Sequence, residues 1–442
     1  MDATAWDTPA AYVMLGAAVL VVLGVLVMGV ASTPAHRLLG LSTQGPWWFS
    51  PAGGRTQGLV VAYVAALVAV AALVFVLADA WTGATSLAWT LAWSSAAVVL
   101  WATAARVARL VVRVATGGRG TWDEPLEADR VRVDDAGDDV DLRAARDAAT
   151  ADDWLPAAHL LAATDDADAR FDRVSELAAL AVRRSRWLEA WRDAEPASPD
   201  AQALHVQALV ELAWMRRGSD WEARDVEGFL EALQAADRAA DEALSVSPRD
   251  ASVLASRLRI ARGLQLGEVE HARRLAQLRD VAPLHRGGLA EALQFAAPKW
   301  FGSTETMFTF ARSVSAEAPA GHATGLLVVV AHVEHFLELG ERSSGAAQAY
   351  MESDATRAEI RAAADRWSAG GPSPVGRAWG HNLLAGAFWM AELPAEAAPH
   401  LAETARHLTS FPWMYAGEPS EVHANVRAWA RARVGDAAIA PA

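Results

Sequence analysis

The chain has 442 residues, of which 53% are hydrophobic, and it carries a formal net charge of −14 at pH 7 with no cysteine. The absence of cysteine excludes disulfides, thiolate nucleophiles and cysteine-ligated zinc or iron–sulfur sites. Neutralising phosphates requires clustered Lys and Arg, so the acidic balance argues against nucleic acid, and a charged partner is expected to be basic.

Three long apolar stretches occupy the N-terminal region. Residues 12–31, 59–78 and 87–105 contain no charged residue. Each is close to the roughly 20 residues that a helix needs to cross about 30 Å of hydrocarbon. We therefore expect a membrane region over residues 1–119. Its transmembrane helices are predicted at about 11–31, 58–79 and 86–107.

Basic residues are distributed asymmetrically around these stretches. Arg37 and Arg55 lie between the first two, and Arg106, Arg109 and Arg113 follow the third. The positive-inside rule then predicts a multi-pass protein of the cell membrane with its N-terminus outside and everything after the third span in the cytoplasm. The three later arginines are expected at the membrane interface. They could pair with anionic lipid headgroups, but ordinary snorkelling of a helix end explains them equally well.

An acidic stretch follows the membrane region. Five aspartates fall between residues 134 and 141, and large apolar side chains are scarce. The stretch lacks the ligand spacing and terminal glutamate of an EF-hand loop. We expect residues 120–150 to form a solvated linker, extended by like-charge repulsion, that holds the next domain away from the membrane surface.

The remaining sequence has the apolar period of α-helices, so the fold is predicted to be all-α. Pro248, Pro283 and Pro319 lie 35 and 36 residues apart, each at the end of a predicted helix. Tetratricopeptide units repeat at about 34 residues as helix, turn and helix. We expect a tetratricopeptide-like helical array over residues 151–370. After a Gly- and Pro-rich break, residues 371–442 should form a helical unit that caps the array.

Three short motifs carry a resemblance to a known family. They are residues 213–218 with Trp221, residues 243–248, and residues 298–303 with Met307. On these motifs, which extend over about residues 152–319, the chain resembles a family of uncharacterised bacterial membrane proteins with a tetratricopeptide-like domain. The resemblance implies a fold and provides no catalytic residues. The motif and structural residues are Trp214, Arg217, Gly218, Trp221, Pro248, Pro283, Lys299, Trp300, Gly302, Ser303 and Met307.

The third motif is typical of a turn between two helices. Pro298 ends one helix, Gly302 permits an unusual backbone angle, and Ser303 can cap the next helix. Trp300 is then expected to be a packing anchor. An alternative interpretation is that Lys299 and Ser303 bind an anion.

Two histidines and a glutamate offer a weak metal-site hypothesis. His332, His335 and Glu338 would lie towards one side of a helix, away from its apolar stripe. Their spacing is not the His-Glu-x-x-His pattern of metalloproteases, and no third protein ligand can be identified. We therefore expect exposed or groove-lining histidines that form hydrogen bonds, and we predict no metal, cofactor or catalytic residue.

The sequence thus favours a membrane-anchored scaffold that binds another protein through a concave helical surface and has no enzymatic activity. Two alternatives remain open. The chain could be a metal-dependent enzyme that uses His332, His335 and Glu338, or a membrane assembly module regulated by its soluble domain.

Overall fold

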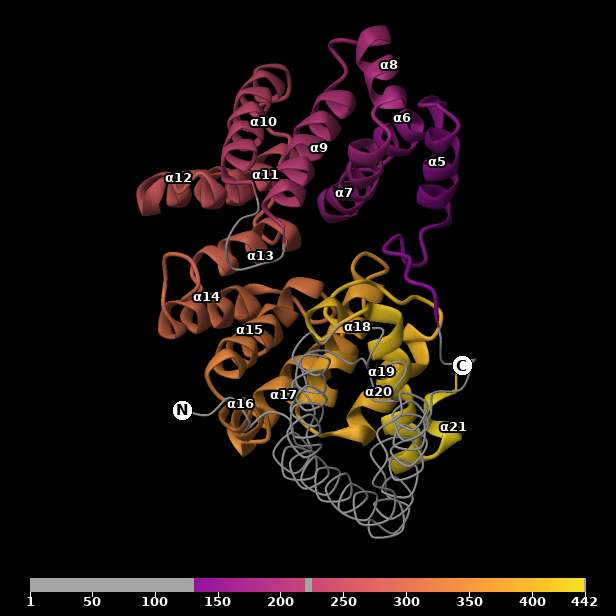
Figure 1. Ribbon diagram of the computed structural model, residues 1–442, viewed down its shortest axis with the longest axis vertical. Coiled ribbons are helices and arrows are strands. Elements are labelled where there is room, and N and C mark those ends of the chain that lie inside the picture. The colour runs from indigo at the N-terminus through magenta and orange to yellow at the C-terminus, as the bar shows by residue number, and fades with distance from the viewer. Residues whose placement is uncertain (1–130, 219–224, 441–442) are drawn as a thin grey trace, which may run out of the picture. The chain divides into compact units, whose positions relative to one another are not determined.

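The computed structural model describes residues 131–218 and 225–440, and these residues are helical with no strands (Figure 1). The all-α prediction is therefore confirmed for this part of the chain. The predicted transmembrane spans, the membrane orientation, Arg106, Arg109, Arg113 and Trp221 lie outside the described residues.

The first eight described helices, α5 to α12, are mostly arranged in pairs. Their bounds are α5 Val140–Thr150, α6 Leu155–Ala162, α7 Ala167–Arg183, α8 Arg186–Ala194, α9 Pro199–Arg217, α10 Val226–Val246, α11 Ala251–Gly263 and α12 Gly267–Val281. The later elements are α13 Arg286–Phe295, α14 Thr304–Glu317, η4 Ala323–Leu326, α15 Leu327–Arg342, α16 Ser344–Met351, α17 Asp354–Ala369, α18 Arg377–Met390, α19 Pro394–Thr404, η5 Trp413–Tyr415, α20 Pro419–Val434 and α21 Asp436–Ile439.

Local sequence determines where many of these helices begin. A side-chain oxygen of Asp or Ser at the N-cap accepts a hydrogen bond from a free backbone N–H of the first turn, which replaces a bond to water. Such caps precede α5, α7, α9, α10, α11, α14, α16 and α17. The capping residues are Asp139, Asp166, Ser198, Asp225, Asp250, Ser303, Ser343 and Ser353.

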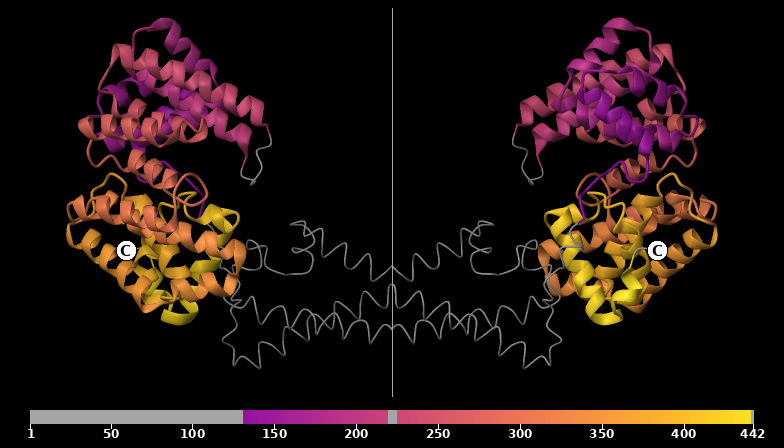
Figure 2. Two further views of the ribbon diagram at one scale, coloured as in Figure 1. Left: turned by 90° about the vertical axis from the view of Figure 1, so that its left-hand side faces the viewer. Right: turned by 90° about the vertical axis from the view of Figure 1, so that its right-hand side faces the viewer.

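The helices form a repeat-like array. Consecutive helices pack in pairs, and the first helix of each pair also contacts the first helix of the next pair. Helix α9 packs along α10 and α11 along α12, while α7, α9, α11 and α13 contact one another in succession. Pro248, Pro283 and Pro319 all lie in the turns that separate successive helix pairs. Figures 1 and 2 show the helices before α13 in one group and those after it in another, with α13 between them.

Small residues allow the close approach of α9 and α10. Ala236, Ala240 and Ala243 of α10 are buried together with Val206 and Val210 of α9 in one apolar cluster. An alanine at each of these positions leaves room for the facing helix, so ridges of one helix enter grooves of the other. Small residues where two helices cross are also a feature of tetratricopeptide units.

The acidic segment differs from the solvated linker expected from the sequence. Helix α5 begins at Val140, inside the range assigned to the linker, and Asp139 both caps it and pairs with Arg173 at 2.7 Å. Asp134 pairs with Arg146 at 2.9 Å. The aspartates that were expected to repel one another are therefore paired with arginines of neighbouring helices, which sequence proximity could not show.

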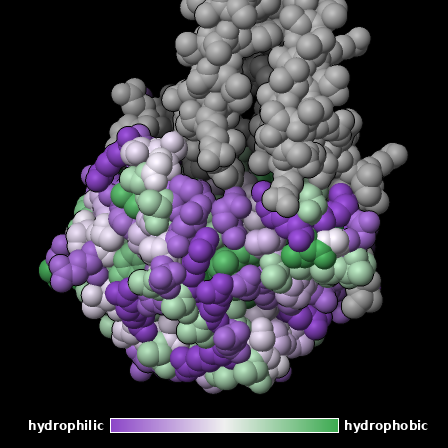
Figure 3. Space-filling model, turned by 90° about the horizontal axis from the view of Figure 1, so that it is seen from below, coloured by the Kyte–Doolittle hydropathy of each residue, from purple (hydrophilic) through white to green (hydrophobic). Residues whose placement is uncertain are grey.

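One helical stretch of the described chain, Ala323–Arg342, is long and apolar enough to cross a membrane. However, 67% of its apolar window is buried inside the protein, as in the core helix of a folded domain. It comprises η4 and α15, and α15 packs against α14, α16, α17 and α18. On the face drawn in Figure 3, hydrophilic and hydrophobic described residues are interspersed.

A buried asparagine organises the C-terminal helices. Asn382 of α18 is 0% exposed, and its amide donates to Ala378 O at 2.9 Å and His407 O at 2.7 Å. Its oxygen accepts from Trp413 Nε1 at 2.7 Å and from Thr409 N at 3.3 Å. All four hydrogen-bonding positions of the amide are thus used.

Replacing this amide should be costly because its partners would stay buried without hydrogen bonds. We expect Asn382→Ala to lower the free energy of unfolding by at least about 3 kcal/mol, since each unsatisfied buried group costs about 1–3 kcal/mol. Intrinsic tryptophan fluorescence of the purified chain would measure the shift in Tm. Gln348→Ala, which removes an amide from the partly exposed face of α16, is the control. Equal shifts for the two variants would contradict the prediction.

Candidate functional site

Two tryptophans of the sequence motifs meet in space. Trp214 lies near the end of α9 and Trp300 in the turn between α13 and α14, and their ring centroids are 5.9 Å apart in an edge-to-face arrangement. The Arg262 guanidinium of α11 lies 4.4 Å from the Trp214 ring and 4.6 Å from the Trp300 ring. Arg217, another motif residue, is 5.8 Å from both rings.

Carboxylates complete this cluster. Glu291 of α13 accepts from Arg262 at 2.6 Å, and Glu211 of α9 accepts from Arg259 at 2.6 Å. Burial acts to raise the pKa of Glu291, but the nearby Arg262 and Arg259 guanidinium groups lower it further than burial raises it. The group therefore stays ionised and paired. This arrangement ties α9, α11 and α13 together.

Residues 298–303, the third motif, form a turn between helices, and their side chains contact other groups of the protein. Lys299 Nζ pairs with Glu334 at 2.6 Å, and Ser303 forms a reciprocal capping box with Thr306. A Cβ at Gly302 would lie 1.9 Å from Ala296 O, so only glycine fits there. Lys299 and Ser303 are thus engaged with protein groups, and the geometry gives the anion interpretation no support. The remaining motif residue of this region, Met307, is buried in the core.

His332 does not match the expectation of an exposed or groove-lining histidine, because its side chain is buried and only 2% of the residue is exposed. Its Nε2 donates to the Glu359 carboxylate at 3.0 Å, which leaves Nδ1 to accept from the Tyr350 hydroxyl at 2.5 Å. Burial lowers the pKa of His332 and raises the pKa of Tyr350 to about 12. Both ring nitrogens are used, and the phenol is not activated as a nucleophile.

The other two members of the metal-site hypothesis lie further along α15, His335 by one turn and Glu338 by nearly two. His335 Nδ1 is 3.1 Å from Glu338 Oε2, and Glu338 also pairs with Arg342 at 2.9 Å. Within residues 131–218 and 225–440, no group of three or more His, Asp or Glu side chains is placed to hold a metal ion. The structure thus does not bring His332, His335 and Glu338 together as a ligand set.

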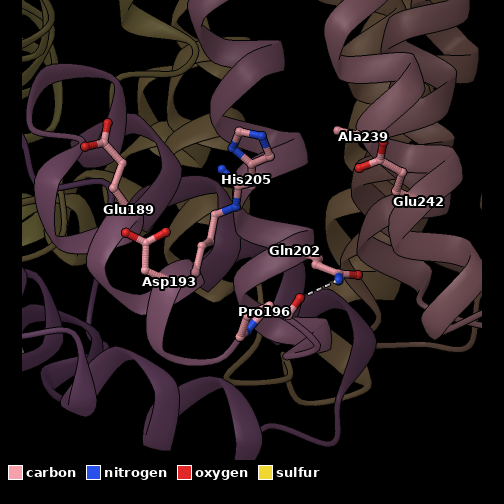
Figure 4. Close-up of a pocket in the computed structure, with 8 residues that line it drawn as sticks. Glu189, Asp193, Pro196, Gln202, His205, Ala239 and Glu242 are labelled. Atoms are coloured by element: carbon pink, nitrogen blue, oxygen red, sulfur yellow. Dashed lines mark hydrogen bonds between the residues drawn. The ribbon is translucent and has the colours of Figure 1, made fainter.

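A cavity of about 260 Å³ lies where α8, α9 and α10 meet (Figure 4). We call it the α8–α10 pocket. Residues of α8, of the turn that follows it, and of the facing sides of α9 and α10 surround it. Its lining consists of Glu189, Arg192, Asp193, Pro196, Gln202, His205, Ala239 and Glu242.

Carboxylates dominate the electrostatics of this pocket. Glu189, Asp193 and Glu242 face a single cation, Arg192, and the structure gives none of the three an ion-pair partner among the described residues. Burial lowers the pKa of His205 to about 4, and the Arg192 charge acts in the same direction, so His205 is neutral at pH 7. The pocket lining therefore has a formal charge of −2.

An unsatisfied acceptor adds to this negative character. Gln202 Nε2 donates to Pro196 O at 3.0 Å, whereas its buried Oε1 has no hydrogen-bond partner within the described structure (Figure 4). A buried acceptor without a partner costs about 1–3 kcal/mol unless a donor reaches it. The pocket can therefore accept several hydrogen bonds and stabilise positive charge.

Sequence reasoning missed this pocket. Glu189 and Asp193 lie four residues apart on α8, but Glu242 belongs to a different helix pair. Each of them has the sequence environment of an ordinary solvated charge. The only available signal was the acidity of the whole chain, which predicts a basic partner but not where it would bind.

Comparisons with models of protein families, with curated proteins and with solved structures found no match to this chain.

Proposed function

We propose that this protein is a membrane-anchored, tetratricopeptide-like scaffold that binds a basic segment of a partner protein in the α8–α10 pocket. The observation that carries the proposal is a cavity between successive helix pairs whose three carboxylates lack protein partners. These three side chains are exposed, and they converge on one cavity, whereas carboxylates between helices such as Glu211 and Glu396 are paired with arginines.

The chemistry of the lining favours an organic cation over a metal ion. Within the described chain these acids form no group able to hold a metal ion, because their carboxylates are too dispersed. A guanidinium or ammonium group at the end of a long side chain has several donors. Such a group can donate to more than one carboxylate oxygen of the lining. We therefore expect an Arg or Lys side chain to occupy the pocket.

Two features of the sequence support the rest of the proposal. The uncharged stretches before residue 106 have the length of membrane spans, and the arginines after them favour a cytoplasmic position for the array. The motif resemblance and the spacing of Pro248, Pro283 and Pro319 agree with a tetratricopeptide-like fold. Arrays of this kind bind partners on extended surfaces that several repeats form together.

Neutralising the pocket should weaken binding without unfolding the protein. We expect Glu189→Gln/Asp193→Asn/Glu242→Gln to reduce affinity for a selected Arg-containing peptide about 10- to 100-fold. Each partly exposed ion pair contributes about 0.2–1 kcal/mol. Display selection of peptides on the full chain in lipid nanodiscs, followed by fluorescence anisotropy, measures this effect.

The control variant removes three exposed acids far from the pocket in sequence, through Asp147→Asn/Asp165→Asn/Glu341→Gln. It should bind as the unchanged chain does, and replacing the peptide arginine by citrulline should abolish the difference between the variants. Selected peptides without a required basic residue would contradict the pocket assignment. Failure to select any peptide would contradict the scaffold itself.

A further inference from the structure

The segment that precedes α5 contacts the C-terminal helices across more than 200 residues of sequence. Asp135 accepts from Ser410 N and from Ser410 Oγ, both at 2.6 Å. Asp134 N donates to Leu408 O at 2.9 Å, and Arg377 donates to Asp138 at 2.5 Å. Figure 1 shows this start of the coloured chain passing beside the C-terminal helices.

We propose that residues 134–138 form a releasable latch. In this proposal the latch holds the loop at residues 405–412 and joins the two ends of the helical array. The inference is independent of partner binding in the α8–α10 pocket.

The fit of the segment indicates a specific contact. Gly137 has φ +59°, which favours glycine, and a Cβ there would lie 3.0 Å from the Ala378 Cβ of α18. His407 Nδ1 donates to Gly137 O at 3.2 Å, and Ala136 is buried. A larger residue at position 137 would push the segment off α18.

The chemistry of the contacts makes them easy to break. The side chains of Arg377 and Asp138 are 46% and 33% exposed, and the Asp135–Ser410 bonds are also at the surface. Exposed ion pairs contribute little individually and are screened by salt. Ala136 is the single buried apolar side chain of residues 134–138. Little apolar burial therefore holds the latch on the loop, and a small difference in free energy can shift the balance between the bound and the released latch.

Other contacts would keep the fold intact when the latch opens. Asn382 holds the inner side of the loop through its bonds to His407 O and Thr409 N. Arg286 of α13 pairs with Asp172 of α7 at 2.5 Å and lies 4.9 Å from the Trp379 ring of α18. Opening therefore frees the outer side of the loop and leaves the array assembled.

Hydrogen exchange of the full chain in nanodiscs tests the proposal, because the Ser410 amide bonds directly to Asp135. We expect Asp135→Ala/Asp138→Ala to increase exchange at residues 405–412 at least tenfold while α9 and α11 keep their protection. The control Asp147→Ala/Asp165→Ala removes the same charge from exposed positions and should leave exchange unchanged. Unchanged exchange in the latch variant, or equal increases throughout the array, would overturn the proposal.

A crosslink tests whether the latch opens in the unmodified protein. The chain has no cysteine, so Asp135→Cys/Ser410→Cys introduces a single pair that an oxidant or a short bifunctional reagent can join. The crosslinked chain should exchange at residues 405–412 at least tenfold more slowly than the unchanged chain. Identical exchange in the crosslinked chain and the unchanged chain would show a permanent contact and would overturn the releasable character of the latch.

Discussion

Acidification from pH 7 to pH 5 is expected to destabilise the helical domain by a few kcal/mol. Burial lowers the pKa of His271 and of His285 to about 4 and that of His400 to about 3. His271 stacks on Phe295 with centroids 3.8 Å apart, and His400 lies against Phe388 at 5.8 Å. Protonation would place a charge in these apolar surroundings, so the folded chain resists it.

Stability falls in acid because the unfolded chain binds these protons at a higher pH than the folded chain does. In the unfolded chain each imidazole takes up a proton near its ordinary pKa of about 6.5, whereas in the folded chain it stays neutral down to about pH 4. Stability is complete above about pH 6.5 and falls as the pH is lowered. Each proton contributes about 1.36 kcal/mol per pH unit, so the three histidines lose about 5 kcal/mol between pH 7 and pH 5.

Carboxyl groups whose pKa values are raised by burial act in the opposite direction, and they are Asp168, Asp172, Glu176, Asp200 and Glu392. Burial, followed by the charge of Asp135, raises the pKa of Glu176 to about 7. The folded chain therefore takes up this proton before the unfolded chain does, and stability rises by about 2 kcal/mol over the same pH range. A net loss of a few kcal/mol is a large part of the roughly 5–15 kcal/mol that is typical of folded domains.

Tm measured by tryptophan fluorescence between pH 7 and pH 5 tests this expectation, and the 19 tryptophans provide a strong signal. His285 Nδ1 accepts from Gly288 N as the N-cap of α13, so His285→Asn keeps a cap and removes a titrating group. This variant should lose less stability in acid than the unchanged chain. His159→Asn, at an exposed position, is the control. A Tm that stays constant over this range would contradict the prediction.

The second large effect is expected at the charged centre of the array. Arg262 is only 6% exposed and lies between Trp214 and Trp300, where Glu291 is its ion-pair partner. Glu291→Ala would leave the guanidinium buried without a counter-charge. Breaking a buried pair from one side costs about 3–5 kcal/mol, so we expect a loss of that size in the free energy of unfolding.

Removing both charges together should restore much of this loss. Arg262→Met/Glu291→Leu replaces the pair by apolar side chains, and a methionine between two indole rings keeps favourable sulfur–aromatic contacts. Asp280→Ala is the matched control, because Arg249 and Asp280 form a pair whose side chains are 67% and 73% exposed. It should cost at most about 1 kcal/mol. Equal losses for Glu291→Ala and Asp280→Ala in denaturant titrations would contradict the prediction.

Local signals predicted much of the helical architecture. Pro248, Pro283 and Pro319 end helices because proline lacks a backbone N–H and clashes with the preceding turn. Ser303 caps α14 as expected, and the glycines and prolines at 370–374 do separate α17 from α18. Each of these features depends on the backbone and on residues within a few positions, which is information that the sequence carries directly.

Contacts between residues that are far apart in the sequence could not be predicted from these local signals. Asp135 and Ser410, Arg262 and Glu291, and the partners of Asn382 are far apart in the chain. His332 was predicted to lie away from the apolar stripe of its helix, yet other helices surround the first half of α15, so residues 327–334 are all buried. The acidic segment looked solvated for the same reason, because its arginine partners belong to other helices.

By itself the sequence determined the helical class of the described region, the positions of many helix ends and the acidic character of the chain. These properties follow from periodicity, capping and composition, which are local or additive. Only the tertiary structure decided which charges are neutralised and which remain available to a ligand. Whether a carboxylate is paired depends on what the fold places within about 4 Å of it. Glu189, Asp193 and Glu242 therefore stand out only once α8, α9 and α10 are packed together.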